Sequence, residues 1–480
     1  MSERSIFPMT CGTDGWRGVI AREFTFETLG ALTEAAALFT RTPPHPEGCN
    51  PGIIALGWDR RFLSQEFAAE AAVRLSEAGF HVLLSDRAVP TPAVSLAVLN
   101  RRLKGGIVIT ASHNPSSYNG FKYKGHYGGS ATPEIYGAIE ALVGRGVEPA
   151  PGGWVELVDF ETPYRSAIGS RVDLDAIRDA GLRVLCDPIH GAGGTTLADV
   201  VGRSKTVVET FRGDFNPSFG GVNPEPIPEN LKATAKRVTE GKFDLAVATD
   251  GDADRLGVLG PDGSFVSPHV VLSLFALHFL RDLEKKGGIG KTFSTTLLLD
   301  RIARNHGVPL VETRIGFKHL VPSLRDGTCM IAGEESGGIG FADFLPDRDG
   351  TLSALMLLDV LSSSRKSLPE LVASLQSEFG PLAYGRRDVH LPVERGGAFV
   401  ESLRNHSPRE VAGVAVTEVR DVDGIKLIFG DPKNPDGWLL HRLSGTEPMV
   451  RLYCELPDQA TVESVLDDAA RRLGEFSAKA

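Results

Sequence analysis

The sequence predicts an α/β protein with three successive mixed α/β domains, largely of parallel strands, and a C-terminal α+β domain with an antiparallel sheet. Up to about residue 383, short apolar runs alternate with longer helical patterns, as is typical of parallel strands with helices on both faces. Beyond that residue the apolar runs follow one another with few helices between them, which indicates antiparallel pairing. At 480 residues the chain is also too long for one core.

The first domain is placed at residues 1–158. Its runs at 53–57 and 81–85 are predicted strands, and the segment 64–79 between them is a predicted helix. The run IVIT, which ends at Thr110, is predicted to be a further buried strand. The end of this strand is of interest because open α/β sheets bind their ligands at strand ends.

The same alternation continues in a second domain, placed at residues 159–265, and a third, placed at 266–383. The third domain extends from His269 through 294–300 to the apolar run at 329–333. The second has a candidate helix from Pro228 and predicted strands at 183–187, 207–210 and 244–249.

The C-terminal domain is placed at residues 384–480. A helix after Gln459 is expected to close its sheet. The predicted strand segments are RDVHLPV, GIKLIF, GWLLHRL and VRLYCEL.

Composition and charge narrow the function classes. The formal charge of −10 and the lack of a long basic run argue against a nucleic-acid groove. The N-terminal residues have no apolar signal-peptide core, and the longest apolar stretch, after His269, is too short to span a bilayer. The five cysteines are scattered, without metal-ligand spacing. We therefore expect a cytoplasmic protein with no nucleic-acid or membrane partner.

The segment DGDADR at 250–255 predicts a metal site. Asp250, Asp252 and Asp254 follow a predicted strand and alternate with Gly and Ala, so their carboxylates can converge on one point. Such hard oxygen ligands suit Mg²⁺. An EF-hand does not fit, because Arg255 stands where that loop needs glycine and Pro261 where it needs glutamate. The alternative is an acidic, solvated turn.

Ser112 lies in TASHNP, directly after the strand that ends at Thr110. A hydroxyl at the mouth of an α/β sheet is a candidate nucleophile or phosphoryl carrier. The alternative is a turn serine that bonds the backbone before Pro115.

Two further segments offer polar contacts. GEESGG places Glu334 and Ser336 between glycines, where both side chains can approach the hydroxyls of a sugar, although an exposed acidic turn is the alternative. RLSGTEP, between two predicted strands, can wrap one phosphate. Its contacting residues would be Arg442, Ser444, Gly445 and Thr446.

Together with GTDGWRG at 12–18, these motifs match in type and order those of the α-D-phosphohexomutases, which the chain resembles over nearly its whole length. The resemblance implies that Ser112 carries a phosphoryl group and binds the metal together with Asp250, Asp252 and Asp254. It also implies that Arg17 faces the phosphoserine. His113 is a candidate phosphate partner, with a structural hydrogen-bonding role as the alternative. Leu443 departs from the family pattern, which usually has proline there.

Two lysines occupy positions that this family uses. Lys122, in YNGFKYK, is a candidate proton shuttle or phosphate contact, with a solvated surface lysine as the alternative. Lys318 lies in TRIGFKH, which resembles a substrate-orienting loop. Nearby phosphates would raise the pKa of Lys318, so an acid role is easier to defend than a base role. Gly316 in the same loop and Arg255 beside the aspartates are expected to contact the substrate.

The resemblance implies an isomerase that interconverts glucose 1-phosphate and glucose 6-phosphate, with Mg²⁺ and with glucose 1,6-bisphosphate as primer and intermediate. GEES-type sugar loops favour glucose. The alternatives are a phosphomannomutase or dual enzyme, a phosphoglucosamine mutase, a metal phosphatase and a non-catalytic sugar-phosphate-binding protein. The site is expected in a central cleft between the four domains of a monomer or homodimer.

Overall fold

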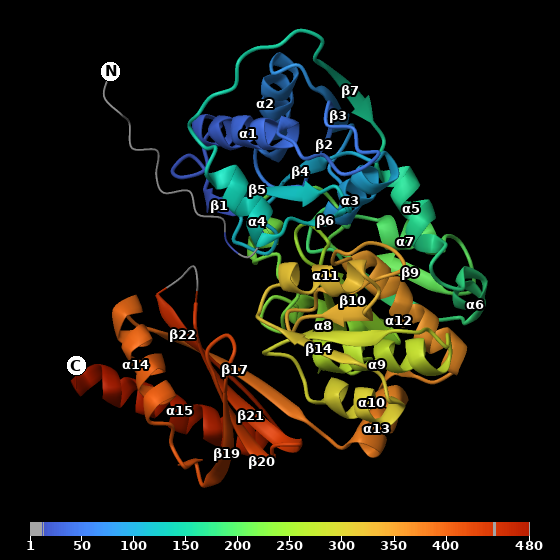
Figure 1. Cartoon of the computed structure of the whole chain (residues 1–480). Coiled ribbons are helices and arrows are strands. Elements are labelled where there is room, and N and C mark those ends of the chain that lie inside the picture. Colours follow the sequence, from blue (N-terminus) through green and yellow to red (C-terminus); the bar gives the residue numbers. More distant parts are fainter. Residues whose placement is uncertain (1–11, 13, 445–447, 480) are drawn as a thin grey trace.

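The computed structural model describes residues 12, 14–444 and 448–479. Four sheets follow one another along the chain (Figure 1). Three are mixed and carry helices, and the fourth is entirely antiparallel, so the predicted fold class is confirmed. The sheets use residues 16–158, 183–266, 288–341 and 383–456. This division supports our proposal of domain limits near residues 158, 265 and 383.

The first sheet has the strand order β1-β5-β4-β2-β3-β7, and β6 pairs with β5. Strands β4, β2, β3 and β7 are parallel, whereas β5 runs antiparallel to both β1 and β4. The strands are β1 (Trp16–Val19), β2 (Ile53–Trp58), β3 (His81–Ser85), β4 (Gly105–Ile109), β5 (Tyr118–Gly125), β6 (Gly129–Ser130) and β7 (Trp154–Val158). The helices are α1 (Phe26–Arg41), α2 (Ser64–Glu77), α3 (Thr91–Asn100) and α4 (Pro133–Glu140).

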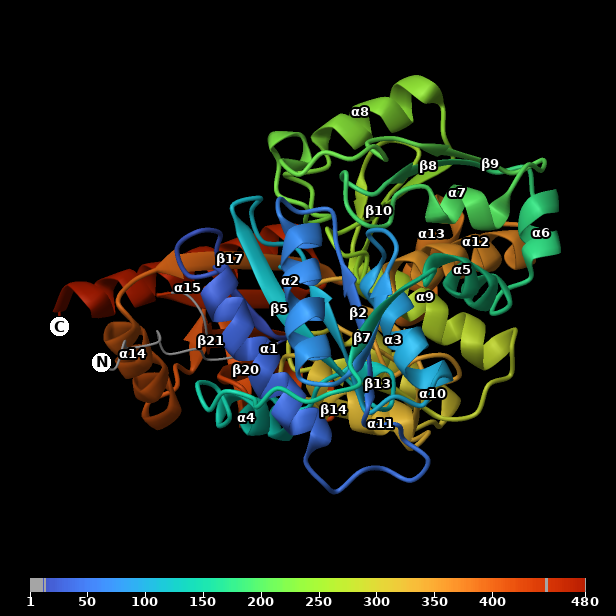
Figure 2. The same ribbon diagram turned by 90° about the horizontal axis from the view of Figure 1, so that it is seen from above.

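The second sheet has the order β12-β11-β10-β8-β9, with parallel pairing among β10, β8 and β9. Figure 2 shows helix α8 on one side of this sheet and α7 on the other. Helix α8 begins at Lys232, later than the predicted start at Pro228, because hydrogen-bonded turns occupy residues 227–231. The elements are α5 (Glu161–Gly169), α6 (Leu174–Asp179), β8 (Arg183–Asp187), α7 (Thr196–Val201), β9 (Val207–Thr210), the short η1 (Phe219–Gly221), α8 (Lys232–Gly241), β10 (Leu245–Thr249), β11 (Leu256–Leu259) and β12 (Phe265–Val266).

The third sheet has the order β14-β13-β15-β16, and only β16 is antiparallel to its neighbour. The apolar segment at 294–300 holds no strand. It follows β13, and helix α10 begins within it, at Leu298. The elements are α9 (Pro268–Arg281), β13 (Gly288–Thr292), α10 (Leu298–His306), β14 (Leu310–Thr313), the short η2 (Phe317–His319), α11 (Val321–Arg325), β15 (Cys329–Gly333), β16 (Ile339–Phe341), α12 (Gly350–Ser364) and α13 (Leu368–Phe379).

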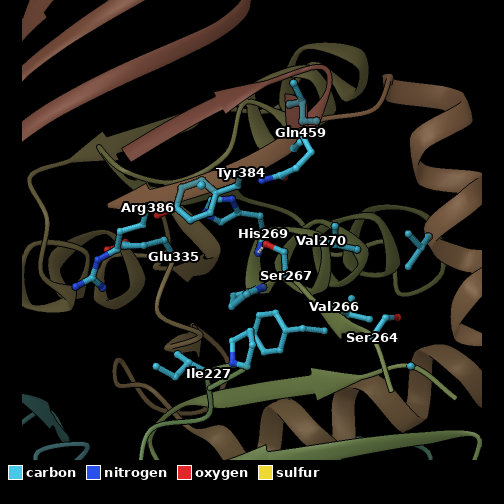
Figure 3. A pocket seen from close by; sticks show the side chains of 18 of the residues that line it. Ile227, Ser264, Val266, Ser267, His269, Val270, Glu335, Tyr384, Arg386 and Gln459 are labelled. Carbon is cyan, nitrogen blue, oxygen red and sulfur yellow. Dashed lines mark hydrogen bonds between the residues drawn. The ribbon is translucent and has the colours of Figure 1, made fainter. Parts of the chain in front are cut away.

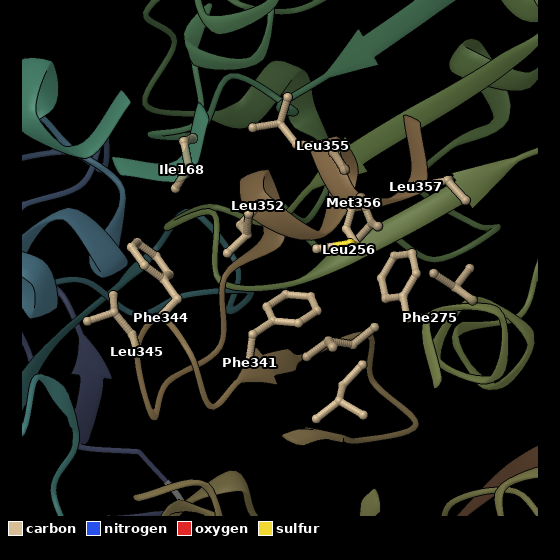
Figure 4. Packing of buried hydrophobic residues seen from close by; sticks show 14 of the residues in the cluster. Ile168, Leu256, Phe275, Phe341, Phe344, Leu345, Leu352, Leu355, Met356 and Leu357 are labelled. Atoms are coloured by element: carbon tan, nitrogen blue, oxygen red, sulfur yellow. The ribbon is translucent and has the colours of Figure 1, made fainter. Parts of the chain in front are cut away.

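Helix α12 joins the second and third domains through one core. Asp349 caps its first turn by accepting a hydrogen bond from the amide of Leu352. Every residue from Gly350 to Leu361 is buried, and the helix packs on α5, α6, α7, α9 and β11. Figure 4 shows Leu352, Leu355 and Met356 within this apolar core. The two domains therefore form a continuous support for the loops at their strand ends.

The C-terminal sheet has the order β17-β22-β21-β20-β19-β18, and helix α15 packs on β17 and β22. Helix α14 had no counterpart in the sequence prediction. The elements are β17 (Ala383–His390), α14 (Val393–Asn405), β18 (Glu410–Val411), β19 (Val414–Asp421), β20 (Ile425–Asp431), β21 (Asn434–Leu443), β22 (Met449–Leu456) and α15 (Gln459–Lys479).

Polar and aromatic groups join the C-terminal sheet to the third domain. The buried Lys426 ammonium donates to the carbonyl of Phe293 at 2.7 Å and lies 4.3 Å from the ring centre of Trp438. The Glu455 carboxylate accepts from the amide of Leu297 at 2.8 Å. None of the described helices combines the length and apolar character needed to cross a membrane.

Candidate active site

Ser112 lies just beyond strand β4, in the loop that joins β4 to β5 of the first sheet. Its side chain is fully buried, and Oγ donates a hydrogen bond of 2.7 Å to Oδ2 of Asp250. Nδ1 of His113 lies 3.5 Å from the same Oγ. Burial, with the charges of Arg255 and Arg17, holds the pKa of His113 well below its usual range. The structure therefore places the candidate nucleophile against the acidic loop, next to a neutral imidazole.

The three aspartates of the acidic loop converge as predicted. The loop joins β10 to β11, and one carboxylate oxygen each from Asp250, Asp252 and Asp254 lies within 4.8 Å of the others. Oδ1 of Asp252 and Oδ1 of Asp254 are buried and take no hydrogen bond from any described residue. Buried carboxylate oxygens without donors suit a hard cation. These residues fit a magnesium ion.

The titration of the loop indicates the same need for positive charge. Burial raises the pKa of Asp250 well above its usual range, and the charges of Asp254 and Asp252 add to this effect. Burial opposes ionisation of Asp252 as well, but the Lys122 ammonium outweighs it, and the pKa of Asp252 is lowered. A bound cation would favour the ionised form of Asp250.

Gly251 allows the serine loop and the acidic loop to approach each other. A Cβ at this position would lie 2.4 Å from the carbonyl oxygen of Ser112, whereas real Cβ atoms essentially never come within 3.0 Å of such a neighbour. The glycine is thus required by a close approach between two backbones.

Lys122 on strand β5 is buried beneath this cluster. Its ammonium lies 2.9 Å from Asp14, 2.7 Å from Asp252 and 3.0 Å from Asp254. Burial alone would lower the pKa of Lys122, but the three carboxylates outweigh it and raise the pKa above its usual value. The raised pKa favours the protonated form of Lys122, so a base role is disfavoured. The alternative of a solvated surface lysine is wrong.

Arg348 is a central residue that the sequence analysis did not identify. It lies two residues before helix α12, and its buried Nη2 donates to Asp14 at 2.5 Å and to Asp254 at 2.7 Å. Nη1 donates to Glu334 of the predicted sugar loop at 3.3 Å. One guanidinium therefore joins loops of the first three sheets. The charged run DRDG before an apolar helix is its only signal in the sequence.

The predicted arginines Arg17 and Arg255 contact the Ser112 loop and the acidic loop, respectively. Nη1 of Arg17, on strand β1, donates to Oδ1 of Asn114 at 2.5 Å. Burial and the charge of Arg255 lower the pKa of Arg17. Nε of Arg255 lies 3.8 Å from Oδ1 of Asp254. Arg17 therefore contacts the loop that carries Ser112, and Arg255 lies beside the acidic loop.

The GEESGG turn lies between β15 and β16. Burial raises the pKa of Glu334, although Arg348 acts against this shift. Ser336 and Glu335 line a cavity of about 1180 Å³ between the second, third and C-terminal sheets (Figure 3). Tyr384 and Arg386 line the same cavity and lie close to Glu335. Among the described residues, Ser112 and the three aspartates lie outside this wall, so the cavity adjoins the sugar loop and not the nucleophile.

The two remaining loops reach the site less directly. Nζ of Lys318 donates to the carbonyl of Gly12 at 3.4 Å, and Gly316 adopts a φ of +122°. Nε of Arg442 lies 3.2 Å from the Asp423 carboxylate, which also accepts from the amide of Ile315 at 2.9 Å. Gly445 and Thr446 lie outside the described residues. Ser444 bonds through its backbone amide to Met449.

Four phosphoglucomutase/phosphomannomutase domain families match the chain in order. Domains I, II and III, each described as alpha/beta/alpha, match residues 8–149, 162–263 and 267–379, and the C-terminal domain matches 412–472. A phosphoglucomutase/phosphomannomutase of Thermococcus kodakarensis is 31% identical over 97% of this chain and 98% of its own. The chain belongs to the phosphoglucomutase/phosphomannomutase family. It is therefore a phosphohexomutase, an isomerase.

Other relatives of this phosphohexomutase carry different substrate names. A Methanopyrus kandleri protein assigned as a phosphoglucosamine mutase is 30% identical over 96% of this chain and 95% of its own. The crystal structure of a Thermus thermophilus protein assigned as a phosphomannomutase superposes with a TM-score of 0.85 and 36% identity, covering 98% of this chain and 99% of the other. The relatives therefore share the family and differ in the sugar phosphate that their names give as substrate.

Each matched domain of this phosphohexomutase contains at least one predicted motif. Ser112 lies in the range of domain I, the acidic loop in domain II, the GEESGG turn in domain III and Arg442 in the C-terminal domain. Direct contacts among the described residues join the first three. The C-terminal motif is linked to them through Asp423 and the third domain.

Proposed function

We propose that this phosphohexomutase interconverts glucose 1-phosphate and glucose 6-phosphate through a phosphoserine at Ser112. The observation that carries the proposal is the 2.7 Å hydrogen bond from Ser112 Oγ to Asp250, within a cluster of three buried aspartates. A site that only bound sugar phosphates would need no buried hydroxyl facing a metal loop. We choose glucose as the sugar because the turn that contains Glu334 and Ser336 is of the GEES type.

Asp250, Asp252 and Asp254 would hold Mg²⁺ together with an oxygen of the phosphorylated Ser112. The ion would neutralise charge on the phosphoryl group during transfer. Arg17 and Arg255 lie beside this position and would add positive charge around the transferred group. His113, neutral and 3.5 Å from Oγ, would be a further phosphate partner.

The enzyme gives one phosphoryl group to the substrate and receives one back, so Ser112 is phosphorylated again at the end of each cycle. Phosphoserine 112 gives its phosphoryl group to the free hydroxyl of the sugar phosphate, whose proton leaves, and glucose 1,6-bisphosphate results. The bisphosphate turns around, and its other phosphoryl group returns to Ser112. Lys122 and Lys318 are the proposed proton carriers, and the raised pKa of Lys122 favours its protonated form. Arg442, Ser444, Gly445 and Thr446 would hold the phosphate that is not reacting, while Gly316, Glu334 and Ser336 contact the sugar.

Purified protein should be assayed with the 1-phosphates of glucose, mannose, glucosamine and N-acetylglucosamine, each with Mg²⁺ and the matching bisphosphate. We expect the highest kcat/KM for glucose 1-phosphate. Because similarly close relatives bear phosphomannomutase and phosphoglucosamine mutase names, a preference for either of those sugars would replace the proposed substrate and keep the mechanism. Net release of inorganic phosphate would indicate a phosphatase instead.

Ser112→Ala tests the mechanism. Loss of the covalent carrier should lower mutase activity by several orders of magnitude. Intact-mass analysis should find one phosphate on part of the wild-type protein and none on the variant. Asp252→Asn should weaken Mg²⁺ binding measured by calorimetry more than it changes sugar-phosphate binding. Near-normal turnover of Ser112→Ala would overturn the proposal.

We also propose a cytoplasmic enzyme that acts on hexose phosphates as a monomer or homodimer.

A further inference from the structure

Arg61 lies directly beneath the loop that carries Ser112. It follows strand β2, and only 2% of its surface is exposed. Its Nη2 donates to the carbonyl oxygens of Ser112 at 2.5 Å and Asn114 at 2.7 Å. Its Nη1 donates to those of Pro115 at 2.8 Å and Tyr118 at 3.1 Å. One guanidinium thus binds four carbonyls of a single loop, a pattern that suits the planar fork of arginine and not the point charge of lysine.

Asp59 binds the Arg61 guanidinium and also binds Thr110, whose hydroxyl contacts the amide of Ser112. Oδ2 of Asp59 lies 3.2 Å from Nε of Arg61 and accepts from Oγ1 of Thr110 at 2.6 Å. Oγ1 of Thr110 in turn accepts from the amide of Ser112 at 2.9 Å. Ser64 donates to the other oxygen of Asp59 at 2.8 Å. The network therefore binds both the amide and the carbonyl of Ser112.

The backbone of Ser112 needs such support. Its φ of +52° lies in the left-handed region, which a side chain with a Cβ disfavours and which glycine usually occupies. Glycine has no hydroxyl and cannot serve as nucleophile, so the serine has to be held there by its surroundings. In this conformation Oγ points to Asp250.

The same carbonyl fixes the distance to the metal loop. Nη2 of Arg61 binds the carbonyl oxygen of Ser112, against which Gly251 packs without room for a Cβ. A shift of this carbonyl would move Oγ relative to all three aspartates. Neither Arg61 nor Thr110 has a described hydrogen bond to those aspartates or to Glu334, Ser336 or Arg442.

We propose that Arg61 and Thr110 are positioning residues for phosphoryl transfer. They hold Ser112 in its left-handed conformation so that Oγ faces the metal loop. This inference rests on the proposed role of Ser112 as phosphoryl carrier. It predicts an effect on the chemical step and none on sugar recognition, because a displacement of about 1 Å at a reacting group can cost on the order of a hundredfold in rate.

A matched pair of substitutions at Thr110 tests the proposal. Thr110→Val keeps the shape but loses the hydroxyl, so the Ser112 amide loses its acceptor. Thr110→Ser keeps the hydroxyl. We expect Thr110→Val to lower kcat by about ten- to a hundredfold with KM for glucose 1-phosphate within about twofold of wild type. Thr110→Ser should stay close to wild type in both constants. Single-turnover phosphorylation of Ser112 by glucose 1,6-bisphosphate, followed by intact mass, should slow in parallel with kcat.

Arg61→Lys provides a second test if Thr110→Val folds poorly. Lysine keeps the charge but cannot reach four carbonyls, so kcat should again fall while KM and the calorimetric Mg²⁺ affinity stay near wild type. Equal kcat values for the valine and serine variants, or a rise in KM that matches the fall in kcat/KM, would overturn the positioning role. An active Ser112→Ala variant would instead overturn the proposed function on which this inference rests.

Discussion

Nη2 of Arg348 donates a 2.7 Å hydrogen bond to Oδ2 of Asp254, and both side chains are buried. Burial works against the charge of Arg348, but Asp254, Asp14 and Glu334 outweigh it and raise the pKa of Arg348 well above its usual value. The pair connects the start of helix α12 to the metal loop. It belongs to a cluster in which two cations, Arg348 and Lys122, compensate several buried carboxylates.

Arg348→Met should destabilise the protein strongly. Removing one partner of a buried ion pair leaves uncompensated charge and costs about 3 to 5 kcal/mol. Arg348→Lys should lose less, because the positive charge remains. Thermal unfolding followed by calorimetry measures both. Arg87→Met is the matched control, because Arg87 pairs with Asp86 on the surface and such pairs contribute about 0 to 1 kcal/mol. Similar losses in the two methionine variants would contradict the role assigned to Arg348.

Gly251→Ala should separate the serine loop from the metal loop. The added Cβ would lie 2.4 Å from the Ser112 carbonyl oxygen, so one backbone has to move. We expect kcat to fall by about a hundredfold, because a small displacement at the reacting groups is costly. Gly137→Ala, on helix α4 with nothing within 4 Å of the added Cβ, should leave kcat unchanged. Steady-state kinetics of both variants measure this, and a fully active Gly251→Ala would show that the loops need not approach so closely.

The sequence predicted what lies at the ends of strands and missed what connects them. Ser112 and Asp250 each follow a buried apolar run, so the pattern placed each at the end of a strand, and the family resemblance predicted that they lie together. Arg348 and Arg61 gain their meaning from partners far along the chain, such as Asp14 and Ser112. No local period or spacing reports such contacts. Lys122 was expected on family resemblance, yet its burial and its pairing with Asp14 emerge only when β5 lies in the first sheet.

Helix α14 shows a local limit of sequence prediction. It contains the adjacent Gly396 and Gly397, which disfavour an isolated helix. Packing supplies the missing stability, because Phe399, Val400 and Leu403 are buried in the core of the C-terminal domain. Tertiary contacts therefore decide this element, and the local residues alone do not.

His441 should make the C-terminal domain sensitive to acid. The ring is buried on strand β21, and burial lowers its pKa to about 4, against about 6.5 in an unfolded chain. Between these values the unfolded state binds a proton that the folded state does not, so stability falls as the pH drops from about 6.5 to about 4. The largest loss from this group is about 3 kcal/mol, and at higher pH it contributes no change.

Hydrogen exchange on the amides of β21 measures this effect as protection factors at pH 7 and pH 4.5. The drop in protection should be smaller in His441→Gln than in wild type, since glutamine does not titrate. His406→Gln removes an exposed histidine of the same domain and should leave the drop unchanged. An equal drop in wild type and His441→Gln would assign the acid sensitivity to other groups.

Arg442→Ala separates binding from chemistry. If Arg442 holds the phosphate that does not react, the substitution removes charge-assisted hydrogen bonds shared by ground and transition states, and this loss appears chiefly as a raised KM. Each such bond contributes roughly 1.5 to 3 kcal/mol, so a lost bidentate contact should cost on the order of a hundredfold in kcat/KM. The impairment should be similar for glucose 1-phosphate and glucose 6-phosphate, because the overall equilibrium is fixed and both phosphates use the same loop in turn.

Steady-state kinetics in both directions test this prediction. Arg471→Ala is the matched control in the same domain, because Arg471 pairs with Asp468 and Glu475 on the exposed side of helix α15 and should leave KM unchanged. Some fall in kcat is also expected for Arg442→Ala, since a loosely held sugar aligns less well with Ser112. Wild-type KM and kcat for both substrates would remove the RLSGTEP loop from the active site. The contacts of Asp423, Lys426 and Glu455 to the third domain would then be structural alone, and a four-domain site would have no support.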